Sequence, residues 1–123
     1  MSSVGVDIIT LRRMRDALET SGTTFLDKAF TPAEQARAAT HPDRVACYAM
    51  TFAAKEAIFK TFGIGRERFE LTDIEIGEGP NGDPVAVLLG RVAEIASQRG
   101  CRVSVSLSCD GDHALAVALL SGR

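Results

Sequence analysis

Two carboxylates far apart in the sequence are the side chains of this chain best suited to chemistry. Asp7 lies within the short apolar run 4–9, and Glu56 lies on the apolar stripe of a long predicted helix. A carboxylate in such surroundings needs a cation or hydrogen-bond donors, because its desolvation alone is costly. If the fold brings both together, the pair suits Mg²⁺, which binds one or two protein carboxylates and leaves positions for water and phosphate oxygens.

Each carboxylate also has a plainer interpretation. Asp7 can be a strand-end or capping residue, and Glu56 can form an ion pair with Lys60 one helical turn later. Both interpretations stay open for the residues taken singly. Only the combination of the two carboxylates favours a metal site, and it does so modestly.

The helix that carries Glu56 is predicted to begin near residues 40–43 and to end at Gly63, whose missing Cβ suits a left-handed C-terminal position. It has roughly twenty residues and a length of about 30 Å. Spacings of three and four residues define its apolar stripe. The stripe contains Val45, Ala49, Phe52, Glu56 and Phe59.

The remaining elements predict an α+β fold with a mainly antiparallel sheet wrapped on this long central helix. The β-branched run 4–9 predicts a strand buried on both faces, and Thr31, Pro32 and Glu34 form a helix start with a capping box. The other predicted elements are a helix at 11–20, a strand at 71–76, a turn at 80–83, a strand at 84–89, a helix at 91–99, an alternating strand at 102–108 and a last strand at 113–120.

Length and composition limit the function classes. With 123 residues, 46% of them hydrophobic, the chain is predicted to form a single domain over residues 1–123. A net charge of −2 with scattered basic residues argues against nucleic acid as a partner. Neither a signal peptide nor a membrane span is expected. The three cysteines are odd in number and unevenly spaced, which predicts reduced thiols and a cytoplasmic protein.

Three ordered blocks resemble a known family. They are Gly5-Val6-Asp7-Ile8, then Phe52-Ala53-Ala54-Lys55-Glu56-Ala57 followed by Lys60, and finally Ser106-Leu107-Ser108. Phe30-Thr31 with Glu34, Asp73-Ile74-Glu75-Ile76, and Asn81-Gly82 with Pro84 agree as well. In order and spacing these residues resemble the 4′-phosphopantetheinyl transferases, and in particular the short holo-acyl-carrier-protein synthase branch. The resemblance runs nearly from end to end.

The resemblance implies transfer of the phosphopantetheine arm of coenzyme A to a serine of an acyl carrier protein, with release of 3′,5′-ADP. It implies that Asp7 and Glu56 hold Mg²⁺ against the pyrophosphate and that Lys60 contacts that pyrophosphate. Glu56 is also the candidate general base for the carrier serine. Lys55 is a further candidate for a phosphate contact, although a lysine at the edge of an apolar stripe is more often a surface residue whose charged end reaches the solvent.

Further residues are expected to bind coenzyme A or the carrier protein. Asn81, Gly82 and Pro84 resemble the family loop that lies against the coenzyme A nucleotide, unless they form only an ordinary hairpin turn. Ser108 is expected to bind coenzyme A too. The resemblance implies that basic residues of the first helix dock the acidic carrier protein, unless they are only a solvated helix face. These residues are Arg12, Arg13 and Arg15.

Two positions depart from the family pattern. Thr51 stands where the family usually has an arginine that contacts a coenzyme A phosphate, and Cys109 stands where it usually has a histidine. Arg44, on the same helical face, can replace the lost arginine only if its side chain reaches back, and His113 is expected on the next strand, past a turn. The alternative function is therefore a catalytically silent or repurposed member that binds carrier proteins or their acyl-phosphopantetheine arm.

Family members of this length usually form trimers with active sites between neighbouring subunits, so a homotrimer is expected. A third possibility keeps Asp7, Glu56 and Mg²⁺ but uses another phosphorylated or thioester-bearing ligand. The sequence leaves the pathway open, whether fatty acid or polyketide biosynthesis.

Overall fold

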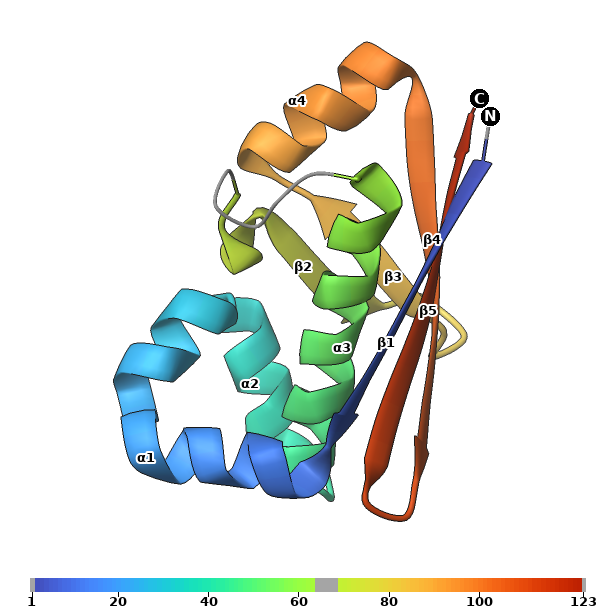
Figure 1. The fold of residues 1–123 in the computed structure, drawn as a ribbon. Helices are drawn as coiled ribbons and strands as arrows, with labels where there is room; N and C mark the ends of the chain where they lie inside the picture. Colours follow the sequence, from blue (N-terminus) through green and yellow to red (C-terminus); the bar gives the residue numbers. More distant parts are fainter. Residues whose placement is uncertain (1, 64–68, 123) are drawn as a thin grey trace.

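The computed structural model describes residues 2–63 and 69–122 (Figure 1). Its elements, in chain order, are β1 (Ser2–Thr10), α1 (Leu11–Ala29), α2 (Pro32–Thr40), α3 (Arg44–Phe62), the short 3₁₀ helix η2 (Leu71–Asp73), β2 (Ile74–Glu78), β3 (Pro84–Leu88), α4 (Gly90–Arg99), β4 (Cys101–Asp110) and β5 (His113–Gly122). This order of helices and strands confirms the predicted α+β class.

The strands form two antiparallel sheets that meet at the long helix. One sheet has the order β1-β5-β4, so the first and last strands of the chain are neighbours, and the other is the hairpin β2-β3. Helix α3 packs against all three strands of the larger sheet. In Figure 1 it runs between this sheet on one side and α1 and α2 on the other. The predicted wrapping of sheet on helix is thus present.

Small residues let β1 lie directly on α3. Ala53, Ala54 and Ala57 of α3 are fully buried, and a Cβ added to Gly5 of β1 would overlap the carbonyl oxygen of Ala57. Only glycine fits at this crossing. The close approach brings the strand that carries Asp7 against the helix that carries Glu56.

The predicted helix ends of α2 and α3 are confirmed in detail. The Thr31 side chain accepts from the Glu34 backbone while the Glu34 side chain accepts from the Thr31 backbone, which is a capping box. Asp43 caps the start of α3, and Gly63 follows its end at φ 68°. Helix α1 is longer than the predicted 11–20, because it continues through a kink at Gly22 to Ala29.

Two strands differ from the prediction. The segment predicted as a strand from residue 71 begins as the 3₁₀ helix η2, and strand pairing starts only at Ile74. The predicted burial of β1 on both faces is wrong for the described chain, because Val4, Val6 and Ile8 are 63%, 48% and 57% exposed. Their neighbours on β5 are exposed too. We call these six residues the outer apolar face: Val4, Val6, Ile8, Leu115, Val117 and Leu119.

Candidate functional site

The site begins at the seam between β1 and α3. Successive side chains of a strand point to opposite faces, so Asp7 lies on the same face of β1 as Gly5, toward α3. The ammonium of Lys60 donates to Asp7 Oδ1 at 3.1 Å and to the backbone oxygen of Val6 at 2.7 Å. The Lys60 and Asp7 side chains are 54% and 19% exposed, so this ion pair is open to solvent.

Glu56 precedes Lys60 by one turn of α3, and residues four apart lie on the same helix face. Its side chain is half-buried, and its Oε1 atom is buried. Lys60 thus brings the Asp7 carboxylate to the part of α3 that carries Glu56. The seam combines two carboxylates with one ammonium, an arrangement that can hold a cation and contact a phosphate at once.

The donor set fits Mg²⁺ better than a fully protein-bound metal. Among the described residues, no group of three or more histidine, cysteine, aspartate and glutamate side chains comes together. Two carboxylates from Asp7 and Glu56 would leave most of the coordination sphere to water and substrate, as Mg²⁺ commonly requires. A metal at this place would share Asp7 with Lys60.

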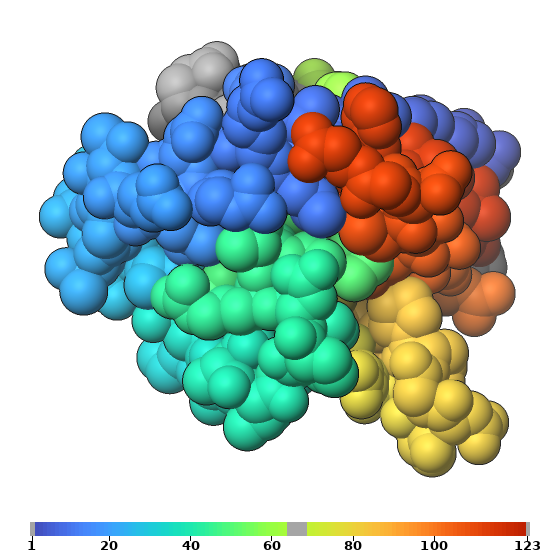
Figure 2. Space-filling view, turned by 90° about the horizontal axis from the view of Figure 1, so that it is seen from below, coloured from blue at the N-terminus to red at the C-terminus, as the bar shows by residue number. Residues whose placement is uncertain are grey.

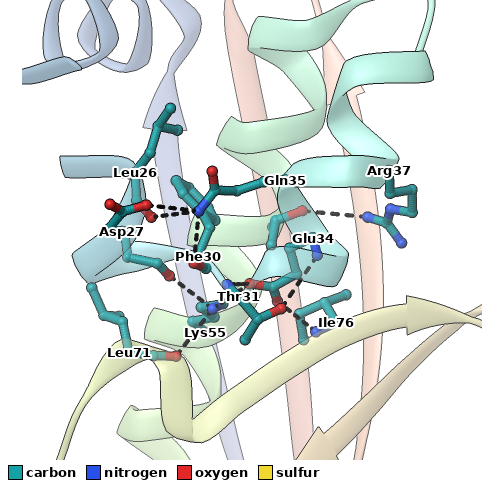
Figure 3. Close-up of polar contacts among 12 residues, drawn as sticks. Leu26, Asp27, Phe30, Thr31, Glu34, Gln35, Arg37, Lys55, Leu71 and Ile76 are labelled. Carbon is teal, nitrogen blue, oxygen red and sulfur yellow. Dashed lines mark hydrogen bonds and ion pairs between the residues drawn. The ribbon is translucent and has the colours of Figure 1, made fainter. Parts of the chain in front are cut away.

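Lys55 is placed differently from the expected phosphate contact. Its ammonium is fully buried, donates to the backbone oxygens of Ala29 and Leu71 at 2.8 and 3.0 Å, and pairs with Glu34 Oε1 at 2.6 Å (Figure 3). These three partners match the three donors of an ammonium group. Burial lowers the pKa of Lys55, and the charge of Glu34 opposes that shift. The geometry leaves Lys55 no donor to offer to a phosphate.

Glu34 completes this buried cluster. Its carboxylate also accepts from the backbone N–H groups of Thr31 at 2.9 Å and Ile76 at 2.6 Å (Figure 3). The ion pair and the hydrogen bond to Ile76 together tie α2, α3 and β2 to one another. From the sequence, Glu34 was expected to be a capping residue that matches the family pattern, and its ion pair with Lys55 was not expected. The alanines at positions 53, 54 and 57 were the one signal that this lysine is internal.

The residues expected to bind coenzyme A lie in two places. Asn81 and Gly82 are exposed in the turn before β3, where Gly82 has φ 80°, and Pro84 begins β3. Ser108 is exposed on β4, and it pairs in register with Leu115 of the outer apolar face. Asp7 points to the other side of the sheet. A single chain therefore does not bring Ser108 to the Asp7–Glu56 seam.

The three arginines expected to dock the carrier protein are all exposed at the start of α1. Leu11, just before the arginines, and Met14, between the second and the third, are buried and anchor the helix. The Thr10 side chain caps this end by accepting from the backbone of Arg13. Helix α1 lies across the face shown in Figure 2. The arginines are Arg12, Arg13 and Arg15.

The structure shows which arginine reaches the Thr51 position. Arg44 lies over the ring of Tyr48, with the guanidinium carbon 5.1 Å from the ring centroid. The guanidinium of Arg37, on α2, donates instead to the Thr51 hydroxyl at 3.3 Å. Arg37 was not expected from the sequence, because this contact depends on how α2 packs against α3. Cys109 is exposed on β4, and His113 begins β5 beyond the turn, as predicted.

Comparisons with known proteins give one consistent result. The family model of the 4′-phosphopantetheinyl transferase superfamily matches residues 3–118. A holo-[acyl-carrier-protein] synthase of Desulforudis audaxviator is 42% identical over 120 residues, which cover 97% of this chain and 92% of the relative. A protein of the same name from Syntrophotalea carbinolica is 35% identical over 125 residues, covering 100% and 98%.

Solved structures agree. The holo-[acyl-carrier-protein] synthase of Neisseria meningitidis superposes with a TM-score of 0.90 at 30% identity and covers 97% of each chain. The holo-[acyl-carrier-protein] synthase of Helicobacter pylori, solved in complex with coenzyme A, has a TM-score of 0.81 at 28% identity and covers 96% of this chain and 99% of its own. Separately, none of the described helices is long and apolar enough to cross a membrane.

Proposed function

This chain belongs to the 4′-phosphopantetheinyl transferase superfamily, and from that premise we propose that it works as a Mg²⁺-dependent holo-[acyl-carrier-protein] synthase. It transfers the phosphopantetheine arm of coenzyme A to a serine of an acyl carrier protein, giving holo-carrier protein and 3′,5′-ADP. The end-to-end match to enzymes of that name, some solved with coenzyme A, supports this activity. It does not favour the alternative of a silent or repurposed member.

The Asp7–Lys60 contact beside Glu56 is the observation that carries the proposal. Asp7 and Glu56 are the residues that would hold Mg²⁺, and the ion, when bound, supplies positive charge for the pyrophosphate oxygens. Lys60 donates to the same pyrophosphate and stabilises the charge that develops on it during transfer. The exposed position of Lys60 leaves room for that contact.

Glu56 also serves as the base. It accepts the proton of the carrier serine, directly or through a water, as the serine oxygen bonds to the β-phosphorus of coenzyme A. The bond between that phosphorus and the bridging oxygen breaks, and 3′,5′-ADP leaves with the electron pair. The two roles of Glu56, ligand and base, place the reacting serine beside the β1–α3 seam.

The nucleotide part of coenzyme A is assigned to Asn81, Gly82, Pro84 and Ser108. The first three are accessible in or next to the β2–β3 turn. Lys55 is proposed as a positioning residue instead of a ligand, since its ammonium is satisfied inside the protein and its backbone directly precedes that of Glu56. The acyl carrier protein docks on Arg12, Arg13 and Arg15, whose exposed positive charges complement an acidic helix.

The outer apolar face supports assembly into a homotrimer. Strand β1 has apolar residues on both faces, as a fully buried strand does, yet one face is exposed to solvent in the single chain. Neighbouring copies would cover it. They would also bring Ser108, on the same side of the sheet, toward a site shared between chains. The free state of Cys47, Cys101 and Cys109 suits a cytoplasmic protein, and residues 1–123 form one domain in this proposal.

The proposal is tested by mixing the purified chain with coenzyme A, Mg²⁺ and a panel of apo-carrier proteins from fatty acid and polyketide pathways. Intact mass spectrometry should show a gain of one phosphopantetheine arm on at least one carrier. The carrier that responds fastest identifies the pathway. Folded protein that modifies no carrier would overturn the transferase assignment and restore the silent or repurposed interpretation.

A further inference from the structure

Arg37 is a half-buried cation that has no carboxylate partner in the described part of the chain. Its guanidinium donates to the Thr51 hydroxyl and lies 4.0 Å from the sulfur of Cys47. The ion pairs Lys55–Glu34 and Lys60–Asp7 do not involve it. A guanidinium has five N–H donors, and a hydroxyl and a thiol occupy only part of them. Arg37 therefore keeps donors and a full positive charge for an anion.

The neutral partners of Arg37 hold it in place. The Thr51 hydroxyl accepts from Arg37 while it donates to the backbone oxygen of Cys47 at 2.8 Å, and Thr51 is only 2% exposed. Figure 3 shows the guanidinium extending from α2 toward α3. A fixed guanidinium loses less conformational entropy on binding an anion than a free one does.

The guanidinium borders a cavity of about 210 Å³ whose walls come from three distant parts of the sequence. Arg37 and His41 lie on the helical side, Gly82 and Pro84 lie on the β2–β3 side, and Leu107 is contributed by β4. Figure 2 shows a notch on this face between the joint of α2 and α3 and the projecting β2–β3 turn. The cavity thus includes the loop assigned to the coenzyme A nucleotide.

His41 also lines this cavity. Its Nδ1 accepts from the backbone N–H of Asp43 at 2.9 Å, so a neutral ring carries its proton on Nε2. Glu78 also lines the cavity, but it is exposed. Its charge is screened by solvent and opposes an anion only weakly.

We propose that Arg37 is the residue of this chain that recognises the ribose 3′-phosphate of coenzyme A, and that it does so in this pocket. The inference rests on the proposed function. The residues assigned to the pyrophosphate, Asp7, Glu56 and Lys60, do not line this cavity. Coenzyme A carries only one other phosphate, the 3′-phosphate. Arg37 thus provides from α2 the phosphate contact that Thr51 is unable to make from α3.

Steady-state kinetics with coenzyme A and with dephospho-coenzyme A, which lacks the 3′-phosphate, test this assignment. Arg37→Gln keeps a donor for Thr51 and removes the charge. It should raise KM for coenzyme A by roughly 10- to 100-fold, the effect of one charge-assisted phosphate contact, with little change in kcat. KM for dephospho-coenzyme A should stay the same. Arg37→Lys, which keeps the charge, should retain part of the preference.

Arg91→Gln is the matched control, because it removes the same charge from an exposed site on α4. An unchanged KM for coenzyme A in Arg37→Gln would overturn the proposal. An equal loss with both donors would also overturn it, since that pattern indicates general damage rather than recognition of the 3′-phosphate.

Calorimetric binding separates this proposal from the proposed function. Wild-type protein should bind 3′,5′-ADP more tightly than AMP, and Arg37→Gln should abolish the difference. If the protein prefers 3′,5′-ADP through Arg37 but modifies no carrier, the phosphate site is supported and the transferase assignment is wrong. If the protein modifies its carrier but binds both nucleotides equally, the transferase assignment holds and the proposed phosphate site is wrong.

Discussion

The Lys60 ammonium lies 3.1 Å from the Asp7 carboxylate, although 53 positions separate the two residues in the sequence. The contact joins the strand that opens the chain to the helix at its centre. Its geometry depends on Gly5, which lets β1 touch α3 near Ala57. A backbone detail thus sets the distance between the groups that are proposed to hold the pyrophosphate.

Lys60→Ala should lower kcat/KM for transfer by about 100-fold, the usual effect of losing one preorganised donor to a developing phosphoryl charge. The fall should be smaller in Lys60→Arg, which keeps a cation. Rates of holo-carrier formation by intact mass spectrometry measure it. Lys28→Ala, another exposed lysine, serves as the control. Equal rates for Lys60→Ala and the control would remove Lys60 from the site.

Lys55→Met should reduce the free energy of unfolding by about 3 to 5 kcal/mol, because it leaves the buried Glu34 carboxylate without its cation. Urea denaturation measures this loss. The double variant Lys55→Met with Glu34→Gln should lose less than the two single losses combined, since the residues interact directly. A loss below about 1 kcal/mol, as for an exposed pair, would contradict the structural role.

The lowered pKa of Lys55 predicts that the free energy of unfolding depends on pH. Burial lowers the pKa of Lys55 from its usual 10.5. The unfolded chain therefore holds this proton more tightly than the folded chain. The Lys55 contribution to the free energy of unfolding should rise as pH increases through the folded pKa and level off above 10.5. The difference in free energy of unfolding between the wild type and Lys55→Met should therefore increase with pH across that window. A difference that does not change with pH would refute the lowered pKa of Lys55.

Local signals predicted most of the fold, and contacts between distant elements did not follow from them. The Thr31–Glu34 capping box and Gly63 mark helix ends that depend only on neighbouring residues, and the structure has both. The Lys55–Glu34 and Arg37–Thr51 contacts depend on how α2 packs on α3. No spacing rule encodes that packing.

The apolar pattern of β1 correctly predicts two apolar faces, but it does not predict that one of them is exposed in the single chain. Its valines and isoleucines predicted burial on both faces, and the single chain buries only one. The residues themselves are well suited to an interface. A pattern reports how apolar a face is and does not identify what covers it.

If the proposed trimer forms, Val6→Asp should convert it to monomers and remove most of the transfer activity. Val6 is 48% exposed in the chain, so the change should cost the fold of one subunit little. Analytical ultracentrifugation gives the oligomeric state. Val87→Asp, at 44% exposed on β3, is the matched control and should stay trimeric. A wild-type protein that sediments as a monomer would rule out the proposed assembly.

Arg13→Glu should raise KM for the carrier protein roughly tenfold through charge repulsion and leave KM for coenzyme A unchanged. The variant should also weaken the dependence of KM on salt, because fewer charges attract the carrier. Arg91→Glu tests whether any exposed arginine has this effect. If both variants behave alike, α1 is not the docking surface.

The proposed metal site is tested by the rate of holo-carrier formation as a function of Mg²⁺ concentration in the wild type, Asp7→Asn and Glu56→Gln. The wild type should show no transfer after chelation and full recovery with Mg²⁺. Asp7→Asn should need far more Mg²⁺, and Glu56→Gln should stay inactive at any concentration. Transfer that is unaffected by chelation, or a Glu56→Gln variant as fast as wild type, would contradict the proposed site.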